Sequence, residues 1–198
     1  MITAIILAAG KSSRLGSPKQ LLPFHKKSLI RVVTENLLET KVDKVIVVLG
    51  HQADTISNEL QGLPVRVIIN PEYELGHSSS MIAGVKAANL NSSLMFVLGD
   101  QPLIKSETIN HLVDLHMESR KIVVPSYQGK NGHPVIFPKK FRSKLLSLQG
   151  DIGAKHIIAA NRNETLFNDV KDQGIILDID TWNDYQLLSR RFNLCLTD

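Results

Sequence analysis

The chain has 198 residues, of which 43% are hydrophobic and 21% charged, and this composition excludes a largely disordered protein. No apolar run reaches the ~18 residues of a membrane span, and the single cysteine excludes an internal disulfide and a cysteine-based zinc site, so we expect a cytoplasmic protein without a membrane partner. The net charge of +4 and the aromatic content of 5% argue against nucleic acid as a partner and suit small phosphorylated molecules.

Continuous apolar runs alternate with amphipathic segments through the first half of the chain. The apolar runs predict strands that are buried on both faces, as in parallel sheets, at residues 2–7, 45–49, 65–69, 94–98 and 122–124. The segments between them predict helices at residues 28–40, 53–60, 79–90 and from 106 onward, the first of them capped by Ser28. This alternation predicts an α/β fold, a three-layer sandwich around a Rossmann-like, mostly parallel sheet.

The alternation breaks down after residue 125. A turn-rich loop at 127–132 precedes a predicted strand at 135–137, helical stretches at 139–148 and 152–160, and a strand at 175–179. Thr181 and Asp184 have the spacing of a capping box, which predicts a final helix that ends near residue 191. Because no linker or repeat interrupts the chain, we expect one domain over residues 1–198. Residues 1–125 are the expected nucleotide-binding half, and residues 126–192 are the expected half for the second substrate, the acceptor.

The stretch after the first predicted strand has the composition of a phosphate-binding loop. Residues 8–20 carry two glycines, three serines and three cationic side chains. Small residues let backbone N–H groups approach phosphate oxygens, and Arg14 and Lys19 supply the countercharge. Five residues separate Gly10 from Gly16 and no lysine follows Gly16, so the loop fits neither the P-loop nor the dinucleotide pattern, which argues against a nicotinamide-dependent oxidoreductase. The alternative is a flexible basic loop without a ligand.

Acidic residues follow two of the predicted strands. Asp100 comes directly after the run at 94–98, where a carboxylate faces the ligand crevice of an open α/β sheet. Asp178 lies in the predicted strand at 175–179 and Asp180 follows two residues later at its end. Their side chains are therefore expected on the same face of this strand. Mg²⁺ binds through one or two carboxylates together with phosphates, which makes Asp100 and one of this pair candidate metal ligands. The alternative for each aspartate is the capping of a turn.

These residues carry a resemblance to a known family. The chain resembles the MobA-like nucleotidyltransferases, within the sugar-nucleotide pyrophosphorylase superfamily, at Leu7-Ala8-Ala9-Gly10, Ser12, Arg14, Gly16, Lys19 and Leu21-Leu22-Pro23. It looks most like the molybdenum cofactor cytidylyltransferases of this family, and this likeness continues at residues 76–80, 99–102, 132–135, 150–154 and 178–181. The resemblance therefore covers nearly the whole chain.

The resemblance implies a fold, a reaction and a partner. The implied fold is that of the nucleotide-diphospho-sugar transferases. The implied reaction is the Mg²⁺-dependent transfer of CMP from CTP to the terminal phosphate of molybdopterin, the organic part of the molybdenum cofactor, with release of pyrophosphate. An apo-molybdoenzyme of the molybdenum hydroxylase type is the implied recipient of the product.

The resemblance also assigns roles to residues of this chain. Lys19 would contact the α-phosphate, Arg14 the departing phosphates, and Asp100 and Asp180 the metal, so Arg14, Lys19 and Asp100 are the expected catalytic residues. The expected nucleotide-binding residues are Leu7, Ala8, Ala9, Gly10, Ser12, Ser13, Arg14, Lys19, Asn70, Gly76, Ser79 and Asp100. The expected acceptor-binding residues are His133, Asp151 and Lys155, the last two at a helix start that suits a phosphate.

The choice of base depends mainly on Ala9. Related guanylyltransferases carry glycine at this position. The extra methyl group of alanine would narrow the pocket so that it accepts a pyrimidine rather than a purine base, which favours CTP over GTP by only ~1–3 kcal/mol. A guanylyltransferase, or a sugar- or alditol-phosphate nucleotidyltransferase of the same fold, is therefore the first alternative. A non-catalytic carrier of the molybdenum cofactor is the alternative of another class. Two departures from the family's pattern weaken the assignment of the acceptor more than that of the chemistry. Lys155 stands in place of the usual arginine, and Trp182-Asn183 stand in place of Pro-Glu.

Overall fold

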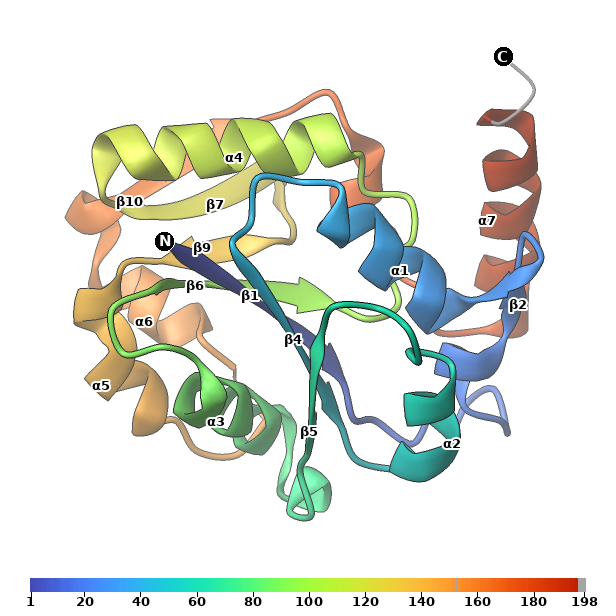
Figure 1. Ribbon diagram of the computed structural model, residues 1–198. Helices are drawn as coiled ribbons and strands as arrows, with labels where there is room; N and C mark the ends of the chain where they lie inside the picture. The colour runs from blue at the N-terminus through green and yellow to red at the C-terminus, as the bar shows by residue number, and fades with distance from the viewer. Residues whose placement is uncertain (152, 196–198) are drawn as a thin grey trace.

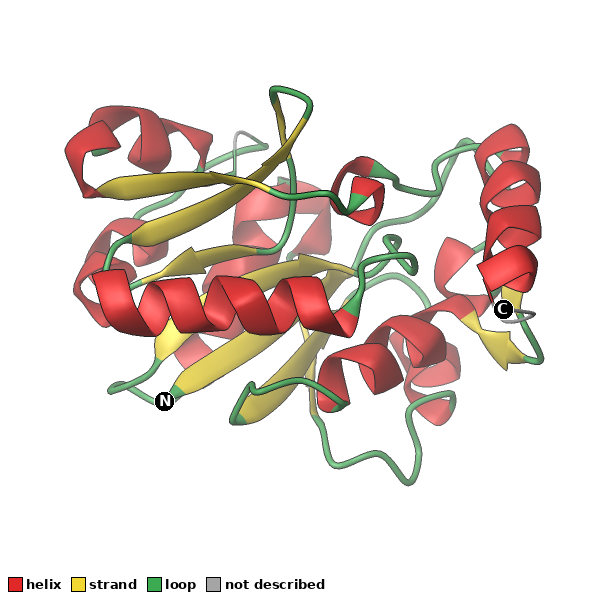
Figure 2. Cartoon of the chain, turned by 90° about the horizontal axis from the view of Figure 1, so that it is seen from above, coloured by secondary structure: helices red, strands yellow, loops and turns green. Residues whose placement is uncertain are grey.

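A mixed, mostly parallel sheet lies between two layers of helices, and this arrangement confirms the predicted α/β fold (Figure 1 and Figure 2). The computed structural model describes residues 1–151 and 153–195, with side chains as far as residue 190. Among the helices of this part of the chain, none has the length and apolar character needed to cross a membrane.

The central sheet has the strand order β10-β7-β9-β6-β1-β4-β5, and β8 pairs with β7. The strands are β1 (Ile2–Ala8), β4 (Lys44–Leu49), β5 (Arg66–Ile69), β6 (Ser93–Leu98), β7 (Ile122–Tyr127), β8 (Lys130–Asn131), β9 (Val135–Phe137) and β10 (Thr165–Asp169). β1 is parallel to both β4 and β6, and β10 is parallel to β7, whereas β9 is antiparallel to both of its neighbours. The carboxyl ends of β1 and β6 therefore meet at one edge of the sheet, where ligands bind in open α/β folds.

Helices cover both faces of this sheet. One face is covered by α1 (Leu29–Leu38), α2 (Ala53–Asn58) and α4 (Ser106–Ser119), and the other by α3 (His77–Ala87), α5 (Arg142–Leu146) and α6 (Lys155–Ala160). The alternation along β1 explains the two layers, because Ala4 and Ile6 face the first core while Ile5 and Leu7 face the second. Neither face of the strand meets water, which accounts for its continuous apolar sequence.

A last helix packs outside the sandwich. α7 (Trp182–Cys195) lies against a small hairpin formed by β2 (Pro23–Phe24) and β3 (Lys27–Ser28), and its Leu188 shares a buried cluster with Phe24. The predicted capping box is confirmed: Asp184 accepts hydrogen bonds from the Thr181 N–H (2.8 Å) and hydroxyl (2.7 Å). Ser28 occupies the N-cap position of α1 as predicted, but its hydroxyl makes no capping hydrogen bond and is buried without a partner among the described residues.

The predicted strand at 175–179 is also wrong. Asp172 accepts the N–H of Gly174 (2.9 Å) and bends the chain into a 3₁₀ helix, Gln173–Ile176. The apolar run is present because Ile175 is fully buried in the first core and Ile179 in the cluster that contains Phe24 and Leu188. The helix predicted at 152–160 begins only at Lys155, and residue 152 lies outside the described residues. The strand β10 is not predicted from the sequence, because its residues, TLFND, contain no continuous apolar run.

Candidate active site

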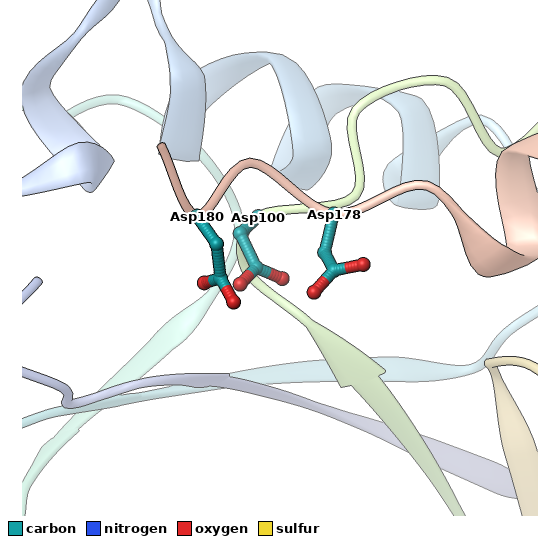
Figure 3. A group of neighbouring side chains, drawn as sticks. All are labelled: Asp100, Asp178 and Asp180. Atoms are coloured by element: carbon teal, nitrogen blue, oxygen red, sulfur yellow. The ribbon is translucent and has the colours of Figure 1, made fainter. Parts of the chain in front are cut away.

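Three aspartates meet at the carboxyl edge of the sheet. Asp100 follows β6, and Asp178 and Asp180 lie on the segment between the 3₁₀ helix and α7. The N–H of Ile179 donates to the carbonyl of Asp100 (3.1 Å), and this bond holds the two segments together. Figure 3 shows the three carboxylates pointing into the same space, where each offers an oxygen within 4.8 Å of the others.

A lysine from the phosphate loop lies within this group. The Nζ atom of Lys19 forms ion pairs with a carboxylate oxygen of Asp100 and with Oδ1 of Asp180 (2.8 Å). Arg14 reaches Asp180 from the more exposed side (3.1 Å). The other oxygen of Asp100, Oδ1, is buried and has no hydrogen-bond partner among the described residues. An unpaired buried carboxylate oxygen beside two further carboxylates fits a hard divalent cation such as Mg²⁺.

Burial and pairing act in opposite directions on the ionisation of this centre. Burial raises the pKa of Asp100, and the nearby ammonium of Lys19 opposes the rise. Burial also lowers the pKa of Lys19, but its pairing with Asp100 and Asp180 outweighs burial and raises the pKa overall. The hydrogen bond from Lys19 lowers the pKa of Asp180. The lysine is therefore held in its charged form by the two carboxylates.

The loop after β1 is fixed by a buried glutamine that the sequence reasoning missed. The side-chain amide of Gln20 donates to the carbonyls of Ala8 (2.9 Å) and Gly10 (3.3 Å). The hydroxyl of Ser12 accepts the N–H of Lys19 (3.1 Å), which fixes the backbone from which the lysine extends. Gln20 carries no charge and is not among the residues that carry the resemblance, so only its position at the end of the loop could have pointed to it.

Two joined cavities lie at this edge of the sheet, and the three carboxylates line the first of them. The first, of about 410 Å³, is lined by seven of the residues predicted to bind the nucleotide: Leu7, Ala8, Ala9, Gly10, Lys19, Gly76 and Asp100. The second, of about 600 Å³, is lined by the three residues predicted to bind the acceptor: His133, Asp151 and Lys155. The cavities share Leu7, His77, Leu98 and Asp151, so they form one continuous site with the carboxylates at the nucleotide end.

The other predicted nucleotide-binding residues lie outside the first cavity. Asn70 donates to the hydroxyls of Ser79 (2.9 Å) and Ser80 (3.1 Å), and Ser79 donates to the carbonyl of Gly76 (2.8 Å). Asn70 and Ser79 therefore hold the start of α3, and Gly76 just before the helix and Ser80 in its first turn line the cavity. Ser12, Ser13 and Arg14 are likewise not among its lining residues.

Glycine 76 allows this turn to approach the acceptor half. Its φ of +102° belongs to the region that favours glycine, and an added Cβ would meet the carbonyl of Gly150 at 2.9 Å. Beside it, the N–H of His77 donates to the carboxylate of Asp151 (2.8 Å). The two halves of the chain therefore touch where the cavities join, which explains why His77 and Asp151 line both.

His133 is a neutral side chain in the second cavity. Burial lowers its pKa to about 4, so the imidazole carries no charge at neutral pH. Its Nδ1 atom is shielded from solvent and has no hydrogen-bond partner in the described part of the chain. The neighbouring walls are apolar, with Phe96, Val135 and Phe137 among them, and Lys155 contributes a positive charge.

This fold, with a basic loop after β1 and a cluster of carboxylates beside two joined cavities, is typical of the nucleotidyltransferases. The chain belongs to the MobA-like NTP transferase family, whose domain matches residues 4–165.

Two relatives illustrate the range of this family. Nicotine blue oxidoreductase of Paenarthrobacter nicotinovorans is 29% identical over 189 residues, which are 91% of this chain and 92% of that protein. Molybdenum cofactor cytidylyltransferase of Escherichia coli strain K12 is 24% identical over 192 residues, which are 96% of this chain and 97% of that one. Their named activities differ, so these likenesses leave the substrate of this chain open.

Solved structures agree with the fold. A homologue of Mycobacterium tuberculosis Rv0371c from Mycobacterium sp. strain JC1 has a TM-score of 0.88 at 29% identity, covering 98% of both chains. Rv0371c of M. tuberculosis in complex with manganese has a TM-score of 0.80 at 26% identity, covering 96% of this chain and 98% of that one.

Proposed function

We propose that this protein transfers CMP from CTP to the terminal phosphate of molybdopterin and releases pyrophosphate. The observation that carries the proposal is the position of the carboxylate–lysine centre beside two joined cavities. A transferase of this kind must hold two substrates end to end, since correct alignment of the reacting groups supplies much of the rate. The cytidylyltransferase relative supports the choice of substrates.

The proposed chemistry needs no general base. The terminal phosphate of the acceptor is largely dianionic at pH 7, because its second pKa is about 6. One of its oxygens forms a bond to the α-phosphorus, the bond to the bridging oxygen breaks, and pyrophosphate leaves with that electron pair. Lys19 and Arg14 stabilise the negative charge on the phosphates. Asp100 and Asp180 would hold Mg²⁺, which supplies further charge stabilisation when bound.

The second cavity suits the proposed acceptor. Its apolar walls fit a planar ring system, and Lys155 offers a positive charge to a phosphate. Neutral His133 can exchange a hydrogen bond with a heterocycle without a charge of its own. Asp151, at the junction of the cavities, would lie close to the reacting end. We place the reaction in the cytoplasm and name an apo-molybdoenzyme as recipient of the product; the single cysteine agrees with the first of these.

Pyrophosphate release tests this function. The protein is incubated with Mg²⁺, molybdopterin with and without molybdate, and CTP, GTP, ATP or UTP in turn. We expect release with CTP, and Asp100→Asn should lower it by at least about 100-fold. Asp114→Asn is the matched control, because Asp114 pairs with Lys41 on the exposed surface of α4. Release with GTP instead of CTP would contradict the choice of base. No release from folded protein with any nucleotide would favour another acceptor or a carrier.

A further inference from the structure

We propose that Lys19 is a removable occupant of the metal position: its ammonium group fills the carboxylate cluster in the free protein and moves to the phosphates when the metal–nucleotide complex arrives. This inference deepens the proposed function and rests on it, because it takes Asp100 and Asp180 as the metal ligands. Its consequence is that the metal alone binds weakly and that metal and nucleotide strengthen each other's binding.

The position of the ammonium supports this interpretation. Lys19 Nζ bridges Asp100 and Asp180, the two proposed metal ligands, although Asp180 is 161 residues away in the sequence. The lysine and Asp100 side chains are only 16% and 15% exposed, so water screens this ion pair little. A divalent ion held by Asp100 and Asp180 would bring a second positive charge directly beside this ammonium, even if it used the free Oδ1 of Asp100. The repulsion between the two cations favours a site in which the ammonium moves away when the metal enters.

The charges of the cluster explain why the nucleotide is needed for the exchange. Asp100, Asp178 and Asp180 contribute three negative charges, while Lys19 and Arg14 contribute two positive charges, which leaves the cluster one negative charge. A divalent ion that displaces Lys19 in the absence of phosphate leaves the ammonium without a partner. Phosphate oxygens of a bound nucleotide offer that partner, so both ligands benefit from being present together.

The lysine can make this move without any rearrangement of the fold. Its backbone N–H is held by Ser12, so the loop keeps its shape while the flexible four-carbon stem changes rotamer. Lys19 lines the same cavity as Ala8 and Gly10, the residues at the start of the phosphate loop. Nothing lies within 4 Å of the position that a Cβ of Gly10 would take, so this side of the loop is open to an incoming phosphate.

Binding of Mn²⁺, followed by its electron paramagnetic resonance signal, tests the exchange without measuring turnover. Free Mn²⁺ is titrated with wild-type protein and with Lys19→Met, each with and without the α,β-methylene analogue of CTP. We expect Lys19→Met to bind Mn²⁺ alone at least about tenfold more tightly than the wild type does. We also expect the analogue to tighten Mn²⁺ binding strongly in the wild type and only weakly in Lys19→Met.

Arg14→Met is the matched control for simple charge. This variant removes the guanidinium group that pairs with Asp180. Because the Arg14 side chain is 69% exposed, water screens its charge, and Mn²⁺ affinity should change by less than about threefold. Lys19→Gln provides a second uncharged variant, and thermal unfolding of each variant establishes that it is folded. The inference is overturned if neither Lys19 variant binds Mn²⁺ more tightly, or if Arg14→Met tightens binding as much.

The failure of the two proposals can be told apart. If no nucleotide releases pyrophosphate while Lys19→Met binds Mn²⁺ more tightly, the proposed reaction fails and the exchange at the metal position stands. If CTP releases pyrophosphate while the Lys19 variants bind Mn²⁺ like the wild type, the reaction stands and the exchange is wrong.

Discussion

A single methyl group lies where the choice of nucleotide base would be made. Ala9 follows β1 at the edge of the first cavity and is only 6% exposed. Its carbonyl accepts the N–H of His51 (3.1 Å), and this bond fixes the backbone at that point. The methyl group therefore cannot move away from a bound base without a change in the loop.

Ala9→Gly should relax the preference for CTP. Removing the methyl group widens the cavity, and we expect the CTP-to-GTP ratio of kcat/KM to fall by about ten- to 100-fold, the equivalent of ~1–3 kcal/mol. Pyrophosphate release with each nucleotide measures this ratio. A variant that folds normally and keeps the wild-type ratio would show that Ala9 does not discriminate between the bases.

The sequence predicts the charged residues of the site better than their contacts. Arg14, Lys19 and Asp100 stand out because cationic or acidic side chains directly follow buried strands. The pairing of Lys19 with Asp180 is invisible in the sequence, since 161 residues separate them and only the folded chain brings them together. Asn70 and Ser79 show the opposite case, in which the sequence predicts contacts to a ligand and the structure shows local ones. Asn70 donates a hydrogen bond to Ser79, and Ser79 donates to the carbonyl of Gly76.

At the scale of single elements, the start of α7 links helix stability to the metal position. Thr181 caps the helix by accepting the N–H of Asp184 (3.2 Å), and the Asp184 carboxylate completes the capping box by accepting the N–H groups of Thr181 (2.8 Å) and Asp180 (3.3 Å). The carboxylate of the capping box therefore also positions the backbone of a proposed metal ligand. This double use explains why a helix outside the sandwich matters for the site.

Asp184→Ala should weaken both features. Loss of the cap costs about 1 kcal/mol, which lowers Tm by about 2–4 °C in a protein of this size. We also expect the KM for the metal–nucleotide complex to rise, because Asp180 loses a constraint. Asp184→Asn is the control, since an amide oxygen can still cap, and it should stay close to the wild type. Thermal unfolding and steady-state kinetics measure the two effects, and an unchanged Tm in Asp184→Ala would contradict the role of the cap.

Elements with regular patterns are predicted well, and elements made by tertiary contacts are not. The strand at 135–137 and the capping box of α7 both follow from local sequence, and both are present. The run at 175–179 is apolar because Ile175 and Ile179 are buried, and burial alone does not distinguish a strand from a 3₁₀ turn. β10 lies at the edge of the sheet with alternating side chains exposed, so its sequence resembles that of a loop.

At the scale of the whole molecule, buried histidines connect stability to pH. His116 is fully buried between α4 and the sheet, where its ring nitrogens contact the carbonyl of Lys121 and the hydroxyl of Ser93, both at 2.8 Å. This pair of contacts suits a neutral ring that donates once and accepts once. Burial lowers the pKa of His77 and His116, and it lowers the pKa of His133 to about 4.

Stability should therefore decline on the acid side of neutrality. Above pH 6.5 these histidines are neutral in both states, but below it the unfolded chain gains protons that the folded chain does not bind. The pKa of His133 alone implies a loss of about 2 kcal/mol at pH 5. Urea unfolding at pH 7 and pH 5 measures the decline, and His116→Gln should make it shallower. A free energy of unfolding that stays constant over this range would contradict the neutral state of the buried rings.

The distance in sequence between Lys19 and Asp180 also governs when the site can form during synthesis. A ribosome releases the phosphate loop and β1 early, but β9 fills the space between β6 and β7 only after residue 137 has emerged. Asp178 and Asp180 follow later still. Until then Lys19 lacks one of its two carboxylate partners. The proposed metal position can therefore be completed only after the segment that carries Asp178 and Asp180 has left the ribosome and packed against the loop after β1.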